Sequence, residues 1–243
     1  MPQIEICVFS PESCLNAQNG GANRVELCGG MYEGGTTPSY GLMQWARKHL
    51  SIELFVMIRP RGGDFCYDEW EFETMKNDIE IAKRIGCDGV VFGILLPDGN
   101  IDIERNQELV NLAKPLKTTI HRAFDMAADP IVALEDIIKV GAVRILTSGQ
   151  KNTAIEGIEL LEKLVKQAAG RIEIMAGAGV NAENAVDLLK TGIDALHLSA
   201  KSLKSGAMVY RKNDVSMTSV FPASEYEIIY SDTQKISDIC LQF

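Results

Sequence analysis

The sequence predicts an α/β chain folded as a single-domain, closed (β/α)8 barrel, the TIM-barrel architecture, with a short C-terminal extension. Eight short apolar runs of strand length recur along the 243 residues, and stretches with helical periodicity fill most of the gaps between them. Strands that alternate with helices pair in parallel through right-handed crossovers. Eight such units in about 250 residues is the usual size of this barrel, which places its functional groups at the C-terminal ends of the strands.

The expected strands are short, and each ends in charged, polar, thiol or glycine residues. We expect them at residues 4–8, 24–27, 53–58, 89–92, 118–121, 144–147, 173–176 and 195–198.

The helices expected between these strands have clear start and stop residues. The first begins after Ser10, with Pro11 at its first position, and ends at the Gly20–Gly21 pair, because proline is favoured at the start of a helix and glycine after its end. Further helices are expected at residues 41–49, 67–85, 102–113, from 129 onward, 153–169 and 182–189.

The chain beyond the eighth strand no longer shows the alternation of strands and helices that predicts the barrel. We expect residues 1–202 to form the barrel and residues 203–243 to form a C-terminal tail and helix packed on it. Residues 201–223 are polar and predict an irregular segment, whereas residues 231–241 predict a final helix against the barrel wall.

Composition and charge exclude several classes of function. A net charge of −9 argues against nucleic acid or an anionic membrane as the main partner. The N-terminus enters a strand directly, so no signal peptide is expected, and no apolar run approaches the ~20 residues of a membrane helix. The six cysteines follow no spacing framework, which predicts reduced thiols in a cytoplasmic protein. No motif for an organic cofactor is evident.

Strand alternation predicts which side chains point into the barrel. Outward side chains must be apolar because they pack on the helices. In the first strand Ile4, Ile6 and Val8 therefore face outward, which turns Glu5 and Cys7 inward. The same rule places these further side chains inside: Arg24, Glu26, Cys28, Met57, Arg59, His121, His197 and Ser199.

Charged side chains inside a barrel need partners or a function, because unpaired buried charge is strongly penalised. Glu26, Arg59 and His121 are expected near the strand ends, where this fold builds its sites, so we interpret them as lining a pocket. The alternative is a structural polar core in which the charged groups satisfy one another. That alternative weighs more for Glu5, which sits deeper in its strand.

Six longer motifs carry a family resemblance. They are VELCGG (25–30), GGTTPS (34–39), MIRPRGGDF (57–65), HRAFD (121–125), LTSG (146–149) and IMAGAG (174–179). In this order they resemble the CutC family, named for copper homeostasis, over residues 3 to about 202, and residues 225–228 resemble its C-terminal tail. The resemblance implies a (β/α)8 barrel and a cytoplasmic homo-oligomer, a dimer or tetramer. One departure is Ala178, where the family usually has glycine.

The resemblance also implies a role in copper homeostasis with Cu(I) binding, and the copper-associated positions of the family match Cys7 and Cys28. Neighbouring parallel strands lie about 4.8 Å apart, so both sulfurs could reach one ion. Cu(I) favours thiolate and thioether ligands, which makes Met57 a candidate third ligand. The alternative is two reduced core thiols that act as small apolar side chains. The other four cysteines are expected to be structural.

The same pocket supports a second hypothesis, an enzyme of unassigned reaction that acts on a small anionic metabolite, phosphorylated or carboxylated. Arginine suits these anions, histidine and carboxylates transfer protons, and the loops after strands seven and eight commonly bind phosphate in this fold. The catalytic candidates are Glu26, Arg59, His121 and Asp125, and the ligand-binding candidates are Arg61, Arg122, Ser148, Gly177, Gly179, His197 and Ser199.

Two other functional hypotheses have less support from the sequence. A hard divalent metal could use Glu26, His121 and Asp125, but the nearby arginines would compete for the carboxylates. A scaffold protein with a degenerate pocket is disfavoured, because an idle pocket would be more stable with apolar side chains. Whether the chain is an enzyme is left open by the sequence.

Overall fold

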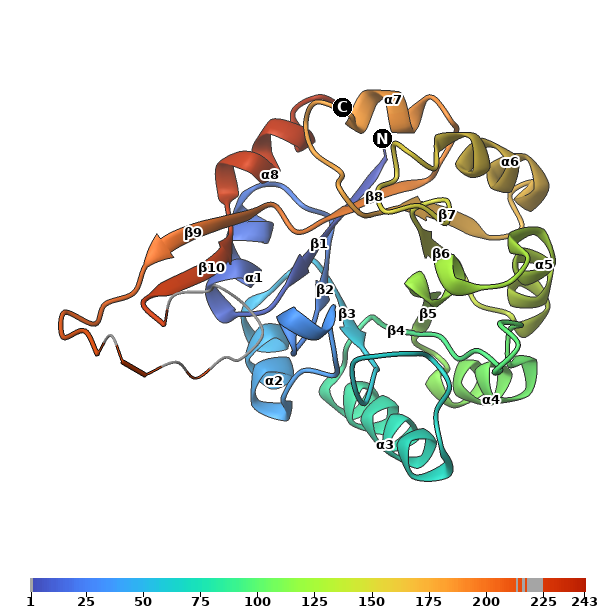
Figure 1. Ribbon diagram of the computed structural model, residues 1–243, viewed down its shortest axis with the longest axis horizontal. Helices are drawn as coiled ribbons and strands as arrows, with labels where there is room; N and C mark the ends of the chain where they lie inside the picture. The colour runs from blue at the N-terminus through green and yellow to red at the C-terminus, as the bar shows by residue number, and fades with distance from the viewer. Residues whose placement is uncertain (1, 213, 216, 218–224) are drawn as a thin grey trace.

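The computed structural model describes residues 2–212, 214–215, 217 and 225–243, and within them eight parallel strands close into a barrel (Figure 1). The strands follow one another around the barrel in sequence order, and β1 closes it against β8. The predicted barrel is confirmed, with strand ends that shift by at most one residue. The strands are β1 (Gln3–Val8), β2 (Arg24–Leu27), β3 (Glu53–Met57), β4 (Gly89–Phe92), β5 (Lys117–Ile120), β6 (Arg144–Thr147), β7 (Glu173–Ala176) and β8 (Ala195–Leu198).

A helix follows each of the first seven strands and covers the outside of the barrel (Figure 1). None of the helices in the described part of the chain combines the length and apolar character needed to cross a bilayer. Two short 3-10 helices, η1 (Met31–Glu33) and η2 (Arg122–Met126), lie in the loops after β2 and β5. The α-helices are α1 (Pro11–Asn19), α2 (Tyr40–His49), α3 (Glu69–Ile85), α4 (Ile103–Ala113), α5 (Pro130–Val140), α6 (Ile158–Ala168) and α7 (Ala185–Leu189).

Side-chain caps fix where several of these helices begin. The Ser10 hydroxyl accepts a hydrogen bond from the Ser13 N–H at the start of α1. At the start of α3, Asp68 and Glu71 form a reciprocal capping box, which satisfies two backbone N–H groups that the helix leaves free. The same helix ends at Gly86, whose φ of 81° is accessible to glycine without strain.

Two helices begin at least three residues later than the sequence predicts. The segment 153–157 forms a turn before α6, because Gly157 packs backbone to backbone against the loop after β6: a Cβ there would lie 2.0 Å from the Ser148 carbonyl oxygen. Helix α7 is delayed to Ala185, since the side-chain oxygens of Asn181 and Asn184 accept hydrogen bonds from nearby backbone N–H groups. Such local bonds compete with helix formation.

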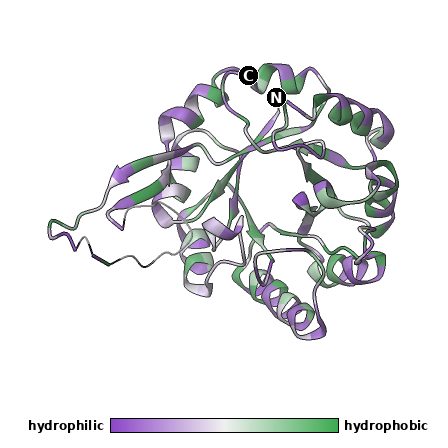
Figure 2. Ribbon diagram, viewed as in Figure 1, coloured by the Kyte–Doolittle hydropathy of each residue, from purple (hydrophilic) through white to green (hydrophobic). Residues whose placement is uncertain are grey.

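The outer and inner surfaces of the barrel form separate clusters, as strand alternation predicts. Ile4, Ile6 and Val8 belong to the large core between the strands and the helices. The barrel interior holds a smaller cluster that includes Cys28 and Met57, with Cys7 packed against it. Figure 2 shows hydrophobic and hydrophilic segments alternating on the surrounding helices, as expected of helices with one buried face.

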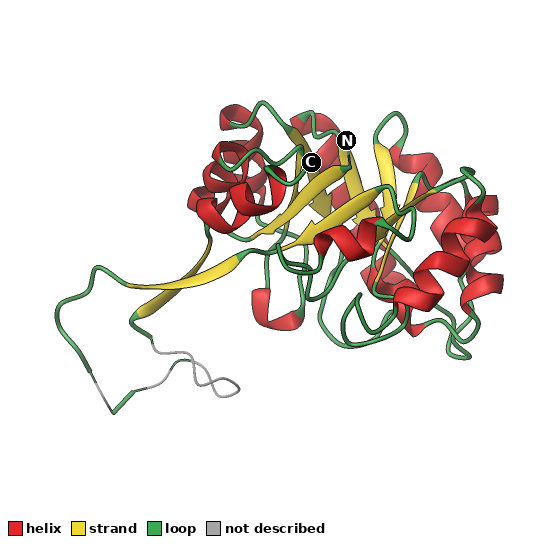
Figure 3. Ribbon diagram, turned by 90° about the horizontal axis from the view of Figure 1, so that it is seen from above, coloured by secondary structure: helices red, strands yellow, loops and turns green. Residues whose placement is uncertain are grey.

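The chain after β8 forms an antiparallel ribbon and a helix. Strand β9 (Lys201–Ser205) pairs with β10 (Glu227–Ser231), and the ribbon projects away from the barrel (Figures 1 and 3). The prediction of an irregular segment is therefore wrong for residues 201–205, because their pairing partner lies far along the chain. Part of that segment, residues 213, 216 and 218–223, lies outside the described residues. Helix α8 (Thr233–Cys240) packs with Ile236 against the end of α1.

Candidate functional site

Two adjoining cavities open at the C-terminal ends of the barrel strands. The inner one, about 110 Å³, is lined by residues of β1, β2, β3, β6 and β8 and of the loops after β2, β3 and β5. The outer one, about 290 Å³, is lined by the loops after β7 and β8 together with Arg122 and Lys201. Cys7, Arg122 and His197 border both cavities.

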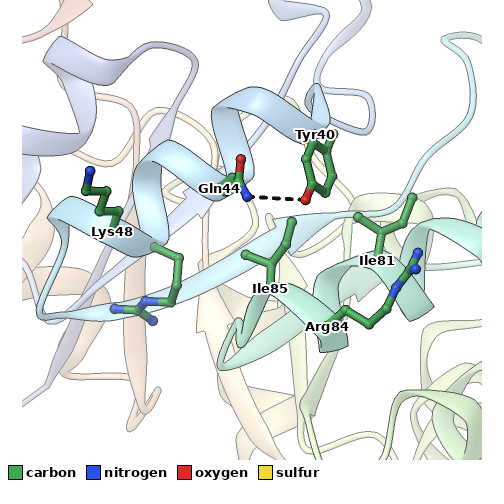
Figure 4. A pocket seen from close by; sticks show the side chains of 7 residues that line it. Tyr40, Gln44, Lys48, Ile81, Arg84 and Ile85 are labelled. Atoms are coloured by element: carbon green, nitrogen blue, oxygen red, sulfur yellow. Dashed lines mark hydrogen bonds between the residues drawn. The ribbon is translucent and has the colours of Figure 1, made fainter.

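A larger hollow of about 560 Å³ lies elsewhere, on the outer helical wall between α2 and α3 (Figure 4). Its lining includes Tyr40, Gln44 and Arg84, and Gln44 donates a hydrogen bond to the Tyr40 hydroxyl over 3.2 Å. These residues lie on the helices and not at the strand ends, so the candidate site is the pair of cavities at the barrel mouth.

Strand register brings four site residues together at this mouth. Cys7 on β1 lies opposite Glu26 on β2, and Glu5 on β1 lies opposite His197 on β8. Cys28 follows β2 directly. We refer to Cys7, Glu26, Cys28 and His197 as the thiol cluster.

The two sulfurs of the thiol cluster are neighbours, with Cys7 Sγ and Cys28 Sγ 3.8 Å apart. The hydrogen bond from Cys28 and the nearby His197 lower the pKa of Cys7 to about 5, despite burial. Burial raises the pKa of Cys28 well above its ordinary value, and the neighbouring Cys7 raises it further. The pair therefore carries one thiolate and one thiol at neutral pH. The Met57 side chain packs in the same cluster: a Cβ built on Gly35 would lie 3.3 Å from Cys28 Sγ and 3.6 Å from the Met57 methyl.

The imidazole of His197 is oriented by a buried carboxylate. Its Nδ1 lies 2.7 Å from Glu5 Oε1, and its Nε2 lies 3.7 Å from Glu26 Oε2. Glu5 is completely buried, but the Arg24 and His197 charges overcome that burial and lower its pKa to about 2. Although burial opposes it, the charges of Glu26 and Glu5 raise the pKa of His197 well above its usual range.

Three polar atoms of residues that line the inner cavity have no hydrogen-bond partner among the described residues: Glu26 Oε1, Arg59 Nε and His121 Nε2. His121 Nδ1 accepts a hydrogen bond from the Ala123 N–H, which leaves the proton on Nε2. Burial, together with the charge of Arg59, lowers the pKa of His121 to about 3, so the ring stays neutral. Burial likewise raises the pKa of Glu26 well above its usual range.

Arg59 and Arg61 use their guanidinium groups to hold loops. Arg59 points into the barrel mouth as predicted, but it donates to the carbonyl oxygens of Glu33, Gly35 and Gly63. Arg61 turns toward the start of α3, where its Nε lies 2.6 Å from Glu71 Oε1. Alternation does not extend into loops, so the sequence could not show that Arg61 turns away from the mouth.

Asp125 and Ser148 belong to a saturated hydrogen-bond network with Arg122 and Thr147, which we call the Asp125 network. The Asp125 carboxylate accepts from the Thr147 hydroxyl (2.5 Å), the Ser148 N–H (3.0 Å), the Gln150 N–H (3.1 Å) and Arg122 Nε (2.7 Å). Ser148 is completely buried. The network ties η2 to the loop after β6, and Arg122 extends from it to the cavities.

The loops after β7 and β8 border the outer cavity through Gly179 and Ser199. Gly177 lies just inside, where a Cβ would approach Leu146 Cδ1 to 2.6 Å. Ala178 adopts a left-handed φ of 74° at a cost of about 1 kcal/mol, so the loop keeps its conformation without the glycine usual at this position.

The structure adds one grouping that the sequence reasoning missed. Cys7 Sγ, a Glu26 carboxylate oxygen and a His197 ring nitrogen all lie within 4.8 Å of one another, a spacing that could hold a metal ion. Alternation placed all three side chains inside the barrel, but their proximity depends on closure of β1 against β8. Closure of the predicted barrel therefore could have predicted that His197 lies close to Cys7.

Comparisons with known proteins agree with the resemblance in the motifs. Residues 2–202 match the model of the CutC family. A human "Copper homeostasis protein cutC homolog" is 46% identical over 234 residues, covering 96% of this chain and 86% of the relative. A CutC family protein from Bacteroides fragilis is 51% identical, covering 97% and 94%. The crystal structure of a putative copper homeostasis protein CutC from Streptococcus agalactiae superposes with a TM-score of 0.78 at 36% identity, covering 82% of this chain and 99% of that one.

Proposed function

This chain belongs to the CutC family of copper homeostasis, and from that premise we propose that it binds Cu(I) through Cys7 and Cys28 at the mouth of the barrel. The observation that carries the proposal is the 3.8 Å separation of the two sulfurs. With metal–sulfur bonds of about 2.3 Å, two thiolates at the tetrahedral angle lie about 3.8 Å apart. This geometry therefore needs little change to hold one ion.

The chemistry of the surroundings favours a soft ion. Cu(I) prefers thiolate and thioether sulfur, and the Met57 thioether packs with the two cysteines. The lowered pKa of Cys7 means that one ligand is deprotonated before the ion arrives. The raised pKa of Cys28 means that binding releases a proton from the second thiol, so affinity should rise with pH.

An anaerobic Cu(I) titration against a competing chelator tests this proposal. The wild type should bind one tight equivalent, and the Cys7→Ala/Cys28→Ala double variant should lose it. Cys14→Ala is the matched control, because Cys14 is a buried thiol of α1 in the outer core. Weak binding, or binding that the double variant retains, would refute the proposal.

One observation favours a second candidate function, an enzyme that acts on a small anionic metabolite. The neutral His121 lines the inner cavity with an unpartnered Nε2–H, and Glu26, which also lines it, has an unpartnered Oε1. A ligand with a carbonyl or hydroxyl group could satisfy both, while Arg122 and Lys201 could bind its anionic part. Thermal-shift screening of phosphorylated and carboxylated metabolites tests this, with stabilisation expected in the wild type and lost in Arg122→Ala.

We also propose that the chain works in the cytoplasm as a homo-oligomer. The β9–β10 ribbon exposes Leu203 and Ile228, and such apolar surface on a projecting element favours association between copies. Light scattering after size exclusion should give a multiple of 26.6 kDa, and the double variant Leu203→Ser/Ile228→Ser should shift the mass toward a monomer.

A further inference from the structure

We propose that the barrel mouth also holds a binding site for a divalent ion of the zinc class, formed by Cys7, Glu26 and His197. Their ligand atoms lie within 4.8 Å of one another and come from three strands of the closed barrel. One thiolate, one imidazole and one carboxylate is a ligand set that zinc accepts. The carboxylate and the imidazole make this side of the cluster harder than the pair of sulfurs that suits Cu(I).

His197 is prepared for this role by its outer partner. Glu5 Oε1 binds Nδ1 over 2.7 Å, which leaves Nε2 directed at Glu26 Oε2, 3.7 Å away. Glu5 is held in turn by the guanidinium of Arg24. A carboxylate behind a ligating histidine fixes its ring orientation and increases its basicity, as in many zinc sites. Glu5 is thus a positioning residue that does not itself contact the ion.

Glu26 supplies an independent observation that points to a cation. Its side chain is 2% exposed, and its Oε1 has no hydrogen-bond partner within the part of the chain that the structure describes. A buried polar atom without a partner is costly, and a cation bound by both oxygens of this carboxylate would remove that cost. Because burial raises the pKa of Glu26, ion binding must release its proton; the resulting carboxylate and the thiolate of Cys7 together would neutralise the two charges of the ion.

The distances require only a small contraction. Zinc bonds of about 2.0–2.3 Å place ligand atoms about 3.3–3.8 Å apart. The His197–Glu26 pair at 3.7 Å already fits, and rotation of the Cys7 side chain can close the remaining gap. Three protein ligands leave a fourth position for a water or a small anion. Cys7 and His197 border the outer cavity, where Arg122 and Lys201 provide positive charge for such an anion.

This site shares Cys7 with the proposed copper site, but it does not depend on copper binding. Cys28 separates the two, since it is a ligand only in the sulfur pair, and His197 is a ligand only in the mixed set. The two ions should therefore compete for Cys7 and respond differently to substitutions at Cys28 and His197.

Cobalt(II), a spectroscopic substitute for zinc, tests the proposal in the anaerobic, metal-free full chain. The wild type should bind one equivalent, with thiolate-to-cobalt charge-transfer absorption and the visible bands of a tetrahedral ion. His197→Gln should weaken binding at least about tenfold, because its amide can still donate to Glu5 but does not replace the imidazole as a ligand. Cys66→Ser is the matched control, a thiol in the loop after β3, and should leave the titration unchanged.

The comparison of cobalt binding between the wild type and His197→Gln decides whether the mixed-ligand site exists. Cobalt binding that His197→Gln leaves intact, or no cobalt binding to the wild type, would overturn the proposal. Zinc K-edge absorption on the wild type gives a second test if His197→Gln does not fold: one sulfur with imidazole scattering supports the site, and two sulfurs without imidazole refute it. A Cu(I) titration of Cys28→Ser runs in parallel, so failure of the copper proposal leaves the cobalt result interpretable.

Discussion

The thiol cluster and the Asp125 network lie at the same mouth of the barrel, yet they differ in how well their polar groups are satisfied. The carboxylate of Asp125 accepts hydrogen bonds from Thr147, Ser148, Gln150 and Arg122. In the thiol cluster, Glu26 keeps an unpartnered oxygen, and the pKa values of Cys7 and His197 are shifted in opposite directions.

This difference distinguishes a charged group that stabilises the fold, Asp125, from one whose free oxygen can bind a ligand, Glu26. A saturated carboxylate has no acceptor capacity left for a metal, so Asp125 stabilises two loops. A buried group with an unpartnered atom is costly to keep unless a ligand satisfies it. Position at the strand ends is therefore not sufficient to assign function in this barrel.

The largest expected effect on stability is the loss of the Asp125 carboxylate. Asp125→Ala leaves the Thr147 hydroxyl and two backbone N–H groups without their acceptor, so we expect the free energy of unfolding to fall by about 4 kcal/mol. Urea denaturation measures this, with Asp125→Asn as a milder control that keeps one acceptor oxygen. If Asp125→Ala is as stable as the wild type but has lost Cu(I) binding, the Asp125 network and not the thiol cluster is the binding site.

Cys7→Ser should have the opposite profile. We expect Cu(I) affinity to fall more than about 100-fold, because a direct ligand contributes more than the 10–100-fold typical of residues behind the ligands. The free energy of unfolding should change by less than about 1 kcal/mol, since serine is nearly isosteric. Chelator competition and urea denaturation of the same preparation test both statements. Unchanged Cu(I) affinity would show that Cys7 is not a copper ligand.

His121 should give the protein a measurable acid sensitivity. Its pKa is about 3 in the folded chain, against an ordinary value of 6.5, so the unfolded chain binds the proton first as pH falls. The free energy of unfolding should therefore decrease from about pH 6.5 downward, by about 2 kcal/mol at pH 5. His121→Gln should lack this component in urea titrations across that range, and parallel pH profiles for the two proteins would argue against a buried neutral imidazole.

The smallest effect is expected at Arg61. Its guanidinium pairs with Glu71 in a partly exposed setting, so Arg61→Ala should cost about 0.5 kcal/mol and leave copper and metabolite binding unchanged. A large loss of ligand affinity in this variant would show that Arg61 leaves Glu71 and reaches the mouth.

The sequence predicted the barrel and the inward position of Cys7, Glu26 and Cys28 because strand alternation is a local rule with a period of two. It also placed His197 inside, but the contact of His197 with Cys7 and Glu26 needs the closure of β8 on β1. That closure belongs to the predicted fold, so this contact was within reach of the sequence.

Other features of the site lay beyond the sequence for physical reasons. Arg61 and Asp125 sit in loops, where side-chain direction follows from partners such as Glu71 and Ser148 and not from a repeating pattern. The β9–β10 pairing joins segments separated by many residues, so the sequence around residues 201–205 carried no local sign of a strand. Contacts with residues distant in the sequence, more than local propensity, determine these side-chain directions and this strand.

The most direct test of the account is copper K-edge X-ray absorption on the Cu(I)-loaded chain, compared with Cys28→Ser. The account predicts two sulfur scatterers at about 2.3 Å in the wild type and the loss of one in the variant. A copper environment of nitrogen and oxygen alone, or one that Cys28→Ser leaves unchanged, would contradict it.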